Sequence, residues 1–334
     1  MKKTTFITAL FLAISISISA CKQQTGETSS AAPKTESSIQ ISADESSETI
    51  SQYEPVTVSD ISETSDLIEP EEPSEEESGE LLSNGDRTID DFQYIVVKDK
   101  CRLIRYIGTE MKVSVPARVT VDGKEYETEI GPGCFKDTDI LLLTLPEHIK
   151  EIPESMCENC TKLSKVTFLN VESIGKRAFW KCENWKIKYD DLNVGTPELL
   201  KKIGTCAFAF SGLYGKVTIR PDMETEFGSF QVCMRVTKVE IQPGVTELPD
   251  CLFAESDDIQ EIILPDTLKK IGARAFISTQ VPSITVPQSV TEMGEFWIST
   301  INSQNKYKGI MLGNKGSAAE EYANKNNIVF SPID

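Results

Sequence analysis

This 334-residue chain contains nine cysteines, the residues in it best suited to bind a metal or to form disulfides. Cys157-x-x-Cys160 has the spacing of half a zinc site. Cys160, Cys182 and Cys233, however, recur at one position of a sequence repeat, and Ser or Thr occupies that position in other copies. A position that accepts Cys, Ser or Thr requires a small side chain rather than a thiolate ligand. We therefore expect cysteines packed in the core, with disulfides as the alternative in an exported protein, and neither a metal nor another cofactor.

The single histidine, His148, limits the catalytic mechanisms open to this protein. Ser-His-Asp and Cys-His triads and histidine-rich metal sites all need the residue. Because His148 follows Glu147 on an expected turn, we interpret it as a solvated loop residue. Carboxylates are numerous and are interpreted as solvated faces, and the sequence contains neither a phosphate loop nor a dinucleotide fingerprint. We expect a protein that is not an enzyme.

The elements that position these side chains recur along the chain. Apolar residues stand at offsets 0, 3, 5, 9, 12 and 17 in one segment: Ile259, Ile262, Leu264, Leu268, Ile271 and Phe276. The same offsets recur at 236–253, 281–298 and 140–157, and residues 163–179 fit after one deletion. Two further copies, near 203–208 and 217–230, are degraded, and an insertion near 190–197 separates copies. A period of 22–23 residues predicts a solenoid, because one turn cannot bury its own apolar face.

Each repeat predicts a short strand followed by a turn. Apolar and polar residues alternate around offsets 3 to 5, as in Val239-Glu240-Ile241, which is the period of a β-strand. A proline then ends the strand in five copies, since proline donates no amide hydrogen. Glycine follows the residue at offset 12 in four copies, Gly175, Gly204, Gly272 and Gly294. We expect those glycines to adopt backbone angles that other residues avoid.

The segment Ile174-Gly175-Lys176-Arg177-Ala178-Phe179-Trp180-Lys181-Cys182 resembles the BspA-like leucine-rich repeat. Ile271-Gly272-Ala273-Arg274-Ala275-Phe276 has the same pattern, and the resemblance covers about residues 92–330. It implies a β-rich, right-handed leucine-rich-repeat solenoid of about eight turns. It also implies a surface protein that binds host matrix proteins or other cells, without identifying the ligand.

The two ends of the repeat array carry different sequences, which we expect to act as caps. Residues 87–134 are expected to form an N-terminal cap and first repeat, 135–308 the repeats and 309–334 a C-terminal cap. Within the last segment, Ser317 can cap a short helix, and a strand at 328–330 follows it.

The first residues have the layout of a secretory signal. Lys2 and Lys3 precede an apolar stretch at 6–18 that is shorter than the roughly 20 residues of a spanning helix. Ile18-Ser19-Ala20-Cys21 resembles the bacterial lipobox, which implies that residues 1–20 are removed and that Cys21 carries lipid. A membrane anchor and export to the cell surface would follow. The alternative is ordinary cleavage near Ala20, with Cys21 as a free thiol.

Residues 21–86 are rich in Ser, Thr, Glu and Pro, and they carry most of the net charge of −18. Residues 22–86 hold 17 acidic and 2 basic side chains, whereas residues 87–334 have a net charge of only −5. Such a composition cannot bury enough apolar surface to order itself, so we predict an acidic disordered stalk. It would act as a spacer or as a solubilising tail. Nucleic acid is excluded as a partner, because no basic stripe exists to neutralise phosphates.

The outward side chains of the predicted strands are the candidate binding residues. They lie between the buried ladder positions and would line a concave sheet: Lys165, Thr167, Lys216, Thr218, Lys238, Glu240, Glu261 and Thr285. Charged and small polar groups on a rigid sheet suit a protein or glycan ligand, although each one can equally be an ordinary soluble strand residue. We expect adhesion to host matrix proteins or to other cells. The alternatives are a structural envelope protein and a lipoprotein that captures a glycan or solute.

Overall fold

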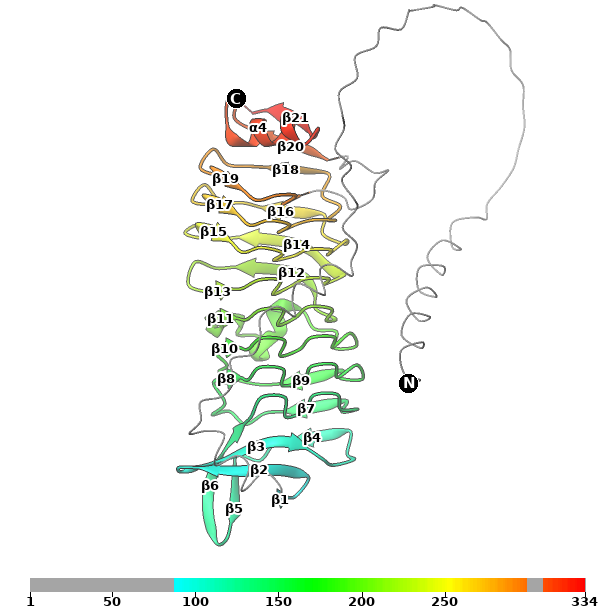
Figure 1. Cartoon of the computed structure of the whole chain (residues 1–334), viewed down its shortest axis with the longest axis vertical. Coiled ribbons are helices and arrows are strands. Elements are labelled where there is room, and N and C mark those ends of the chain that lie inside the picture. The colour runs from blue at the N-terminus through cyan, green and yellow to red at the C-terminus, as the bar shows by residue number, and fades with distance from the viewer. Residues whose placement is uncertain (1–86, 299–308, 334) are drawn as a thin grey trace, which may run out of the picture. The chain divides into compact units, whose positions relative to one another are not determined.

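Each sequence repeat folds into one turn of a parallel β-solenoid, as predicted (Figure 1). The computed structural model describes residues 87–298 and 309–333; the expected signal, Cys21 and the acidic stalk lie outside them. The apolar columns found in the sequence are the core: in the turn at 236–253 all six repeat positions are buried. Helix content is small, as expected.

A first ladder of parallel strands runs along one side of the stack (Figure 1). Its strands form three sheets: β4 (Lys112–Ser114), β7 (Leu142–Thr144) and β9 (Lys165–Thr167); β12 (Tyr214–Ile219), β14 (Arg235–Ile241) and β16 (Glu261–Ile263); and β18 (Ser283–Thr285), β20 (Ile310–Gly313) and β21 (Val329–Pro332). A single bridge between Lys188 and Tyr214 adds one rung before β12. The ladder has ten described rungs rather than about eight, because β20 and β21 extend it into the C-terminal cap.

A second ladder of two-residue strands lies on the other side of each turn (Figure 1). It consists of two sheets: β8 (Glu151–Ile152), β10 (Ser173–Ile174), β11 (Lys202–Ile203) and β13 (Glu224–Thr225), and then β15 (Glu247–Leu248), β17 (Lys270–Ile271) and β19 (Glu292–Met293). Proline follows both strands that begin a sheet: Pro153 comes after β8 and Pro249 after β15. Since proline has no amide hydrogen, it cannot bond to the preceding turn, and the ladder is interrupted there.

The glycines of the repeat are required for close packing of turns, not for unusual backbone angles. None of Gly175, Gly204, Gly272 and Gly294 has a positive φ angle, so our prediction for them was wrong. A Cβ atom on Gly204 would lie only 2.8 Å from the backbone nitrogen of Lys176 in the preceding turn. Any larger residue would therefore separate adjacent turns at this point.

A column of stacked aromatic rings fills the centre of the solenoid. Phe208, Phe230, Phe253 and Phe276 stack with centroid separations of 5.8, 5.0 and 5.7 Å and interplanar angles of 7° or less. All four side chains are fully buried. The column continues through Phe179, 5.6 Å from Phe208 and on the far side of the insertion.

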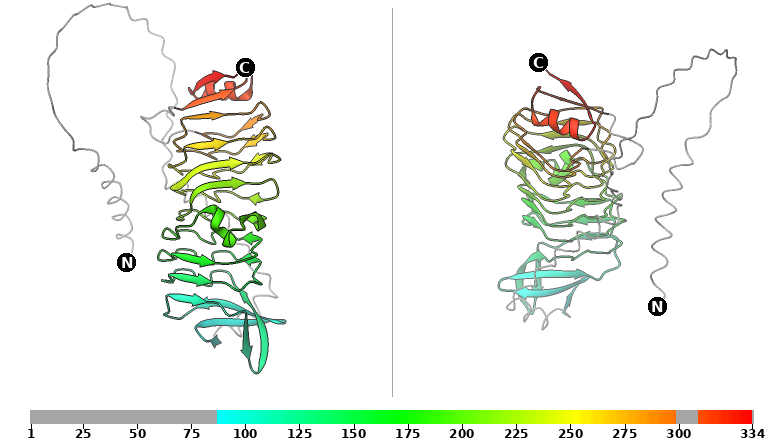
Figure 2. Two further views of the ribbon diagram at one scale, coloured as in Figure 1. Left: turned by 180° about the vertical axis from the view of Figure 1, so that it is seen from behind. Right: turned by 45° about the horizontal axis from the view of Figure 1, so that its top comes forward.

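Distinct elements close the two ends of the stack (Figure 2). At the N-terminal end, β1 (Thr88–Ile89), β2 (Phe92–Val97), β3 (Lys100–Tyr106), β6 (Lys124–Ile130) and β5 (Arg118–Val121) form one sheet in that order. At the other end, helix α4 (Ala318–Lys325) begins after Ser317, whose side chain accepts a hydrogen bond from the Glu320 amide, as predicted. The predicted last strand is β21, one residue later than expected.

The insertion forms two short 3-10 helices, η2 (Tyr189–Val194) and η3 (Pro197–Leu199). Asn193 attaches η2 to the stack, because its buried side chain bonds both the amide and the carbonyl of Val171 at 3.0 Å. Arg220 holds η3 through bonds to the Pro197 and Glu198 carbonyls at 3.2 and 3.0 Å.

Candidate functional site

The predicted binding residues lie on the outward side of the first ladder, which we call the strand face. Their side chains are exposed or half-buried, while the residues between them, such as Val166, Val217 and Val239, are buried. The strand face comprises Lys165 and Thr167 on β9, Lys216 and Thr218 on β12, Lys238 and Glu240 on β14, Glu261 on β16 and Thr285 on β18. Register places Lys216 beside Lys238, and Lys238 beside Glu261, so the structure brings the middle of this set together.

Ion pairs organise the charges at the centre of the strand face. Lys216 pairs with Glu240 at 3.1 Å, and Lys238 pairs with Glu261 at 2.8 Å. Each lysine therefore bonds a carboxylate of the next rung, which relieves the repulsion between Lys216 and Lys238. Lys165 makes no ion pair within the described part of the chain, so its charge faces solvent alone. The strand face thus offers both free charge and ordered, neutralised pairs.

The position shared by Cys, Ser and Thr is structural. The thiols at this position donate to a backbone carbonyl of the preceding turn: Cys160 to Phe135 at 2.9 Å, Cys182 to Cys157 at 3.1 Å and Cys233 to Phe208 at 3.3 Å. Ser256 makes the same bond to Phe230 at 3.2 Å. These four side chains therefore connect adjacent turns. The threonines at the same position, Thr138 and Thr279, instead donate to a carbonyl of their own turn, so the position accepts a short hydrogen-bond donor but does not always join two turns.

The eight cysteines of the described segments are buried and free. Burial raises the pKa of Cys134 and of Cys233 to about 12, so these thiols stay protonated at neutral pH. Cys160 differs, because a hydrogen bond with the Cys157 thiol lowers its pKa. Among the described residues, no group of three or more His, Cys, Asp or Glu side chains is arranged to hold a metal ion.

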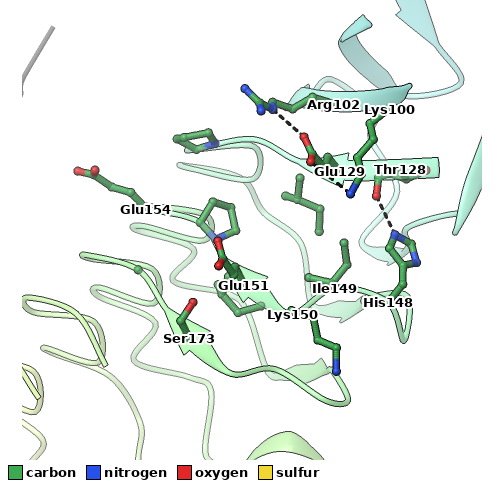
Figure 3. A pocket seen from close by; sticks show the side chains of 15 residues that line it. Lys100, Arg102, Thr128, Glu129, His148, Ile149, Lys150, Glu151, Glu154 and Ser173 are labelled. Atoms are coloured by element: carbon green, nitrogen blue, oxygen red, sulfur yellow. Dashed lines mark hydrogen bonds and ion pairs between the residues drawn. The ribbon is translucent and has the colours of Figure 1, made fainter. Parts of the chain in front are cut away.

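A cleft of about 590 Å³ lies between the N-terminal cap and the first turn of the second ladder (Figure 3). Lys100, Arg102 and Glu129 line it from the cap, and Glu151 and Ser173 from the ladder. Arg102 bonds Glu129 at 3.0 Å, and the Lys100 ammonium lies 3.6 Å from the same carboxylate. Charged groups of both signs therefore surround this space.

His148 lines the same cleft and lies on a turn, as we expected, but it is half-buried rather than solvated. It is half-buried, and its Nε2 lies 2.8 Å from the carbonyl oxygen of Thr128. Since a carbonyl only accepts, Nε2 carries the hydrogen. The sequence did contain a signal for this site, because Pro153 stands where four other turns have glycine. We did not predict a cleft from that difference.

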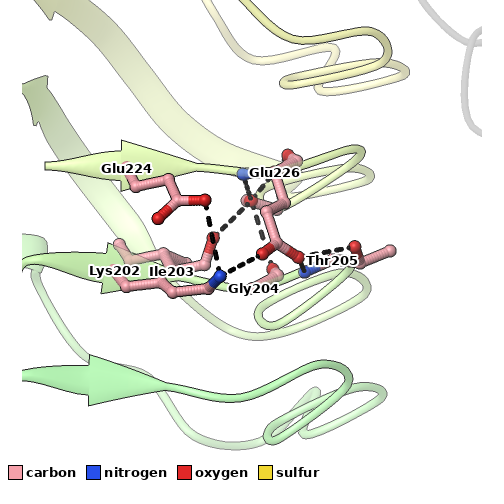
Figure 4. Close-up of polar contacts among 7 residues, drawn as sticks. Lys202, Ile203, Gly204, Thr205, Glu224 and Glu226 are labelled. Atoms are coloured by element: carbon pink, nitrogen blue, oxygen red, sulfur yellow. Dashed lines mark hydrogen bonds and ion pairs between the residues drawn. The ribbon is translucent and has the colours of Figure 1, made fainter.

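A second polar cluster lies on the second ladder, around Glu226 (Figure 4). Its carboxylate accepts from the amide and hydroxyl of Thr205 at 2.9 and 2.8 Å and pairs with Lys202 at 2.7 Å. Burial by itself raises the pKa of Glu226, but the bonds from Lys202 and Thr205 outweigh it and leave the pKa below its ordinary value. Both carboxylate oxygens are engaged, so this cluster joins two turns rather than forming a ligand site.

The fold and these surfaces define a class of protein: a capped parallel β-solenoid whose turns present a repeated strand face. A model of the BspA type leucine rich repeat region matches in six copies, over residues 128–225 and 186–306. The chain therefore belongs to the BspA-type leucine-rich repeat family. The BspA-like resemblance proposed from the sequence is confirmed. No curated protein matches the sequence.

One solved structure of a bacterial leucine-rich repeat protein has the same fold, and two further ones match less closely. A protein from Bacteroides ovatus is 19% identical, covers 74% of this chain and 67% of its own, and gives a TM-score of 0.55. A leucine rich cell surface protein from Faecalibacterium prausnitzii is 22% identical over 68% of this chain, with a TM-score of 0.43. This chain spans only 54% of that protein's length. The T. pallidum leucine rich repeat protein is 23% identical over 56% of this chain and 86% of its own, with a TM-score of 0.47.

These comparisons indicate no catalytic family. Within residues 87–298 and 309–333, no helix is both long and apolar enough to cross a bilayer. Cys21 lies outside the described residues.

Proposed function

We propose that this protein is displayed on the bacterial surface and binds a protein or glycan of a host or neighbouring cell through the strand face. The observation that supports this most is the strand face itself: a row of exposed and half-buried polar side chains, with ordered ion pairs at its centre. A rigid sheet holds such groups at fixed spacing, so little ordering entropy is lost on binding. The description of the F. prausnitzii structure as a cell surface protein agrees with this location.

The test is capture of matrix proteins and intact cells by the chain from residue 22 onward. Lys216→Glu combined with Lys238→Glu should lower capture at least about tenfold, because reversed charges in register repel what the wild type attracts. Thermal stability should change little, since each exposed ion pair contributes about 1 kcal/mol or less.

A matched control places the same charge changes on the second ladder. Lys201→Glu with Lys270→Glu breaks two exposed ion pairs, to Asp222 and Glu292, away from the strand face. Capture by this control should equal that of the wild type. Equal loss of capture in both double variants, or no capture by the wild type, would contradict the proposal and favour a structural envelope role.

We also propose that Cys21 carries lipid and that residues 22–86 act as a spacer. As a flexible coil, such a segment spans about 45 Å root-mean-square, and more when like charges repel. Cys21→Ser should move the protein from the membrane fraction to the soluble fraction and abolish incorporation of labelled fatty acid. Retention of the label would show that another residue is acylated.

A further inference from the structure

The second ladder stops at β8 because the next segment joins a different sheet. Glu129 and Ile130 occupy the repeat positions that should pair with Glu151 and Ile152, one period later. Instead, β6 pairs in parallel with β3, and Ile130 lies opposite Leu103. The Gly131 amide donates to the Leu103 carbonyl at 2.8 Å, so this segment turns away from β8. The cleft of Figure 3 occupies the resulting gap.

Two hydrogen bonds of the regular ladder are missing at this gap. Between β8 and β10, the Ser173 amide bonds the Lys150 carbonyl, and the Gly175 amide bonds the Ile152 carbonyl. One turn earlier, the equivalent bonds would run from the Glu151 amide to the Thr128 carbonyl and from the amide of residue 153 to the Ile130 carbonyl. His148 bonds the Thr128 carbonyl instead, and Pro153 has no amide hydrogen to donate.

The gap therefore lies between two strand edges with unused backbone groups. The carbonyls of Lys150 and Ile152 face β10, so the amide and carbonyl of Glu151 between them face the cap. The Gly131 amide faces β3, so the amide and carbonyl of Ile130 face β8 by the same alternation. A parallel strand edge of this kind can bond another extended chain.

Thr128, which lines the cleft, carries an unsatisfied polar atom. Its residue is fully buried and lines the cleft, yet its Oγ1 has no hydrogen-bond partner. A buried hydroxyl without a partner costs free energy, and such groups are uncommon in folded proteins. A polar atom of a bound molecule would satisfy it.

Charge at the rim distinguishes between possible ligands. Lys100 pairs with Glu127 at 3.3 Å and Lys150 pairs with Glu172 at 3.4 Å, so carboxylates already neutralise both lysines. Glu151 is exposed and forms no ion pair with any described residue. The charge left free at the cleft is therefore negative, which favours a cationic group in the ligand.

We propose that the cleft binds an extended peptide segment of a partner protein that carries a lysine or arginine. The peptide adds a strand between β6 and β8, bonds the free groups of Ile130 and Glu151, and places its cation against the Glu151 carboxylate. Strand addition to an exposed sheet edge is an established mode of peptide recognition, and the cleft volume lies in the range of ordinary ligand sites. This site is separate from the strand face, so either proposal can fail without the other.

The test uses the full-length chain and capped pentapeptides of alternating valine and threonine, with one lysine placed in turn at each position. Binding is measured by isothermal titration calorimetry. At least one lysine peptide should bind saturably. Replacing its lysine by glutamate should weaken binding at least about tenfold, because the carboxylates repel. N-methylation of alternate backbone amides should abolish binding, because strand addition depends on those amides. Failure of all five lysine peptides, or equal binding of the N-methylated peptide, would overturn the proposal.

Substitutions in the protein provide a second test of the site: two change residues of the cleft, and a third is a control. Glu151→Gln should weaken binding of the tightest-binding lysine peptide about fivefold, as expected for loss of one partly exposed ion pair. Glu292→Gln, at the equivalent place on β19, should leave binding unchanged. Thr128→Val should weaken binding and raise thermal stability, because it removes the unpaired buried hydroxyl. A Thr128→Val protein that is more stable but binds as the wild type does would show that the hydroxyl does not contact the peptide and would contradict this geometry.

Discussion

Residues in the left-handed backbone conformation occur two positions before and two positions after the aromatic column in turn after turn. Arg177 and Lys181 flank Phe179 with φ of 52° and 60°, and Cys251 and Glu255 flank Phe253 with φ of 55° and 58°. Each such residue costs about 1–2 kcal/mol. The conformation persists because it aligns the amides with the next turn, as in the bond from the Cys251 amide to the Ala273 carbonyl at 2.9 Å.

At the same scale, the lowered pKa of Glu226 predicts a pH-dependent contribution to the free energy of unfolding. Because its pKa is lowered in the folded protein, this contribution is present above the unfolded value near 4.5 and is lost as the pH falls through the folded value. Glu226→Gln should therefore lower the free energy of unfolding by about 1 kcal/mol at pH 7, a modest loss because the side chain is partly exposed. Urea denaturation at pH 7 and pH 3 measures this, and the two proteins should converge at pH 3.

The neighbouring Glu224 provides the control for this prediction. It also pairs with Lys202, at 3.4 Å, but its side chain is 63% exposed. Glu224→Gln should change stability by less than about 0.5 kcal/mol at either pH. A Glu226→Gln protein with the wild-type pH profile would mean that the bonds to Thr205 and Lys202 do not form in solution.

At the scale of elements, the insertion shows how a solenoid tolerates extra residues. Phe179 and Phe208 of the aromatic column are 29 residues apart in the sequence instead of 22 or 23, which predicted the insertion near 190–197, and η2 and η3 occupy 189–199. What holds them was not evident from the sequence. Asn193 replaces a strand partner for Val171, because its amide group carries both a donor and an acceptor in the geometry of a peptide bond.

We therefore expect Asn193 to be the main attachment of the insertion. Asn193→Gly removes the side chain without a conformational penalty, because residue 193 has φ of 53°. It leaves a buried amide and a buried carbonyl of Val171 unpaired, which should cost about 3 kcal/mol in thermal or urea unfolding. Asn327→Gly is the matched control: Asn327 has φ of 55° but is exposed, so the change should cost less than about 0.5 kcal/mol. Similar losses in both variants would refute the role of the side chain.

At the scale of the whole molecule, the stack behaves as a one-dimensional array in which each turn contacts its neighbours. Phe230 lies near the middle, stacked 5.8 Å from Phe208 and 5.0 Å from Phe253. A defect there weakens two interfaces between turns, and it divides the array into two parts that each retain a cap.

Phe230→Ala should lower the free energy of unfolding by about 3–5 kcal/mol through the cavity that it creates. It should also separate unfolding into two transitions, seen as non-coincident urea curves by circular dichroism and tryptophan fluorescence. Phe296→Ala removes a ring that is 49% exposed and should keep a single transition near the wild-type midpoint. One coincident transition in Phe230→Ala would show that cooperativity extends across the defect.

The sequence by itself determined the solenoid, the buried columns, the insertion and the C-terminal helix. It could do so because a repeated turn must place like residues in the same environment, so that burial appears as a period in the sequence. The same period identified the outward residues of the strand face. The unusual backbone angles predicted for the repeat glycines were wrong, and His148 is half-buried rather than solvated, because the pattern of one turn does not show how closely the next turn approaches it.

Only the tertiary structure decided where the ladders stop and which groups meet there. The cleft between β6 and β8 depends on β6 pairing with β3, a contact between residues 27 positions apart that lies outside the repeat register. The bond from His148 to Thr128, the unpaired Thr128 hydroxyl and the pairing of Lys216 with Glu240 depend likewise on register between turns. A period shows which side chains face outward, whereas their partners are set by how one turn is placed upon the next.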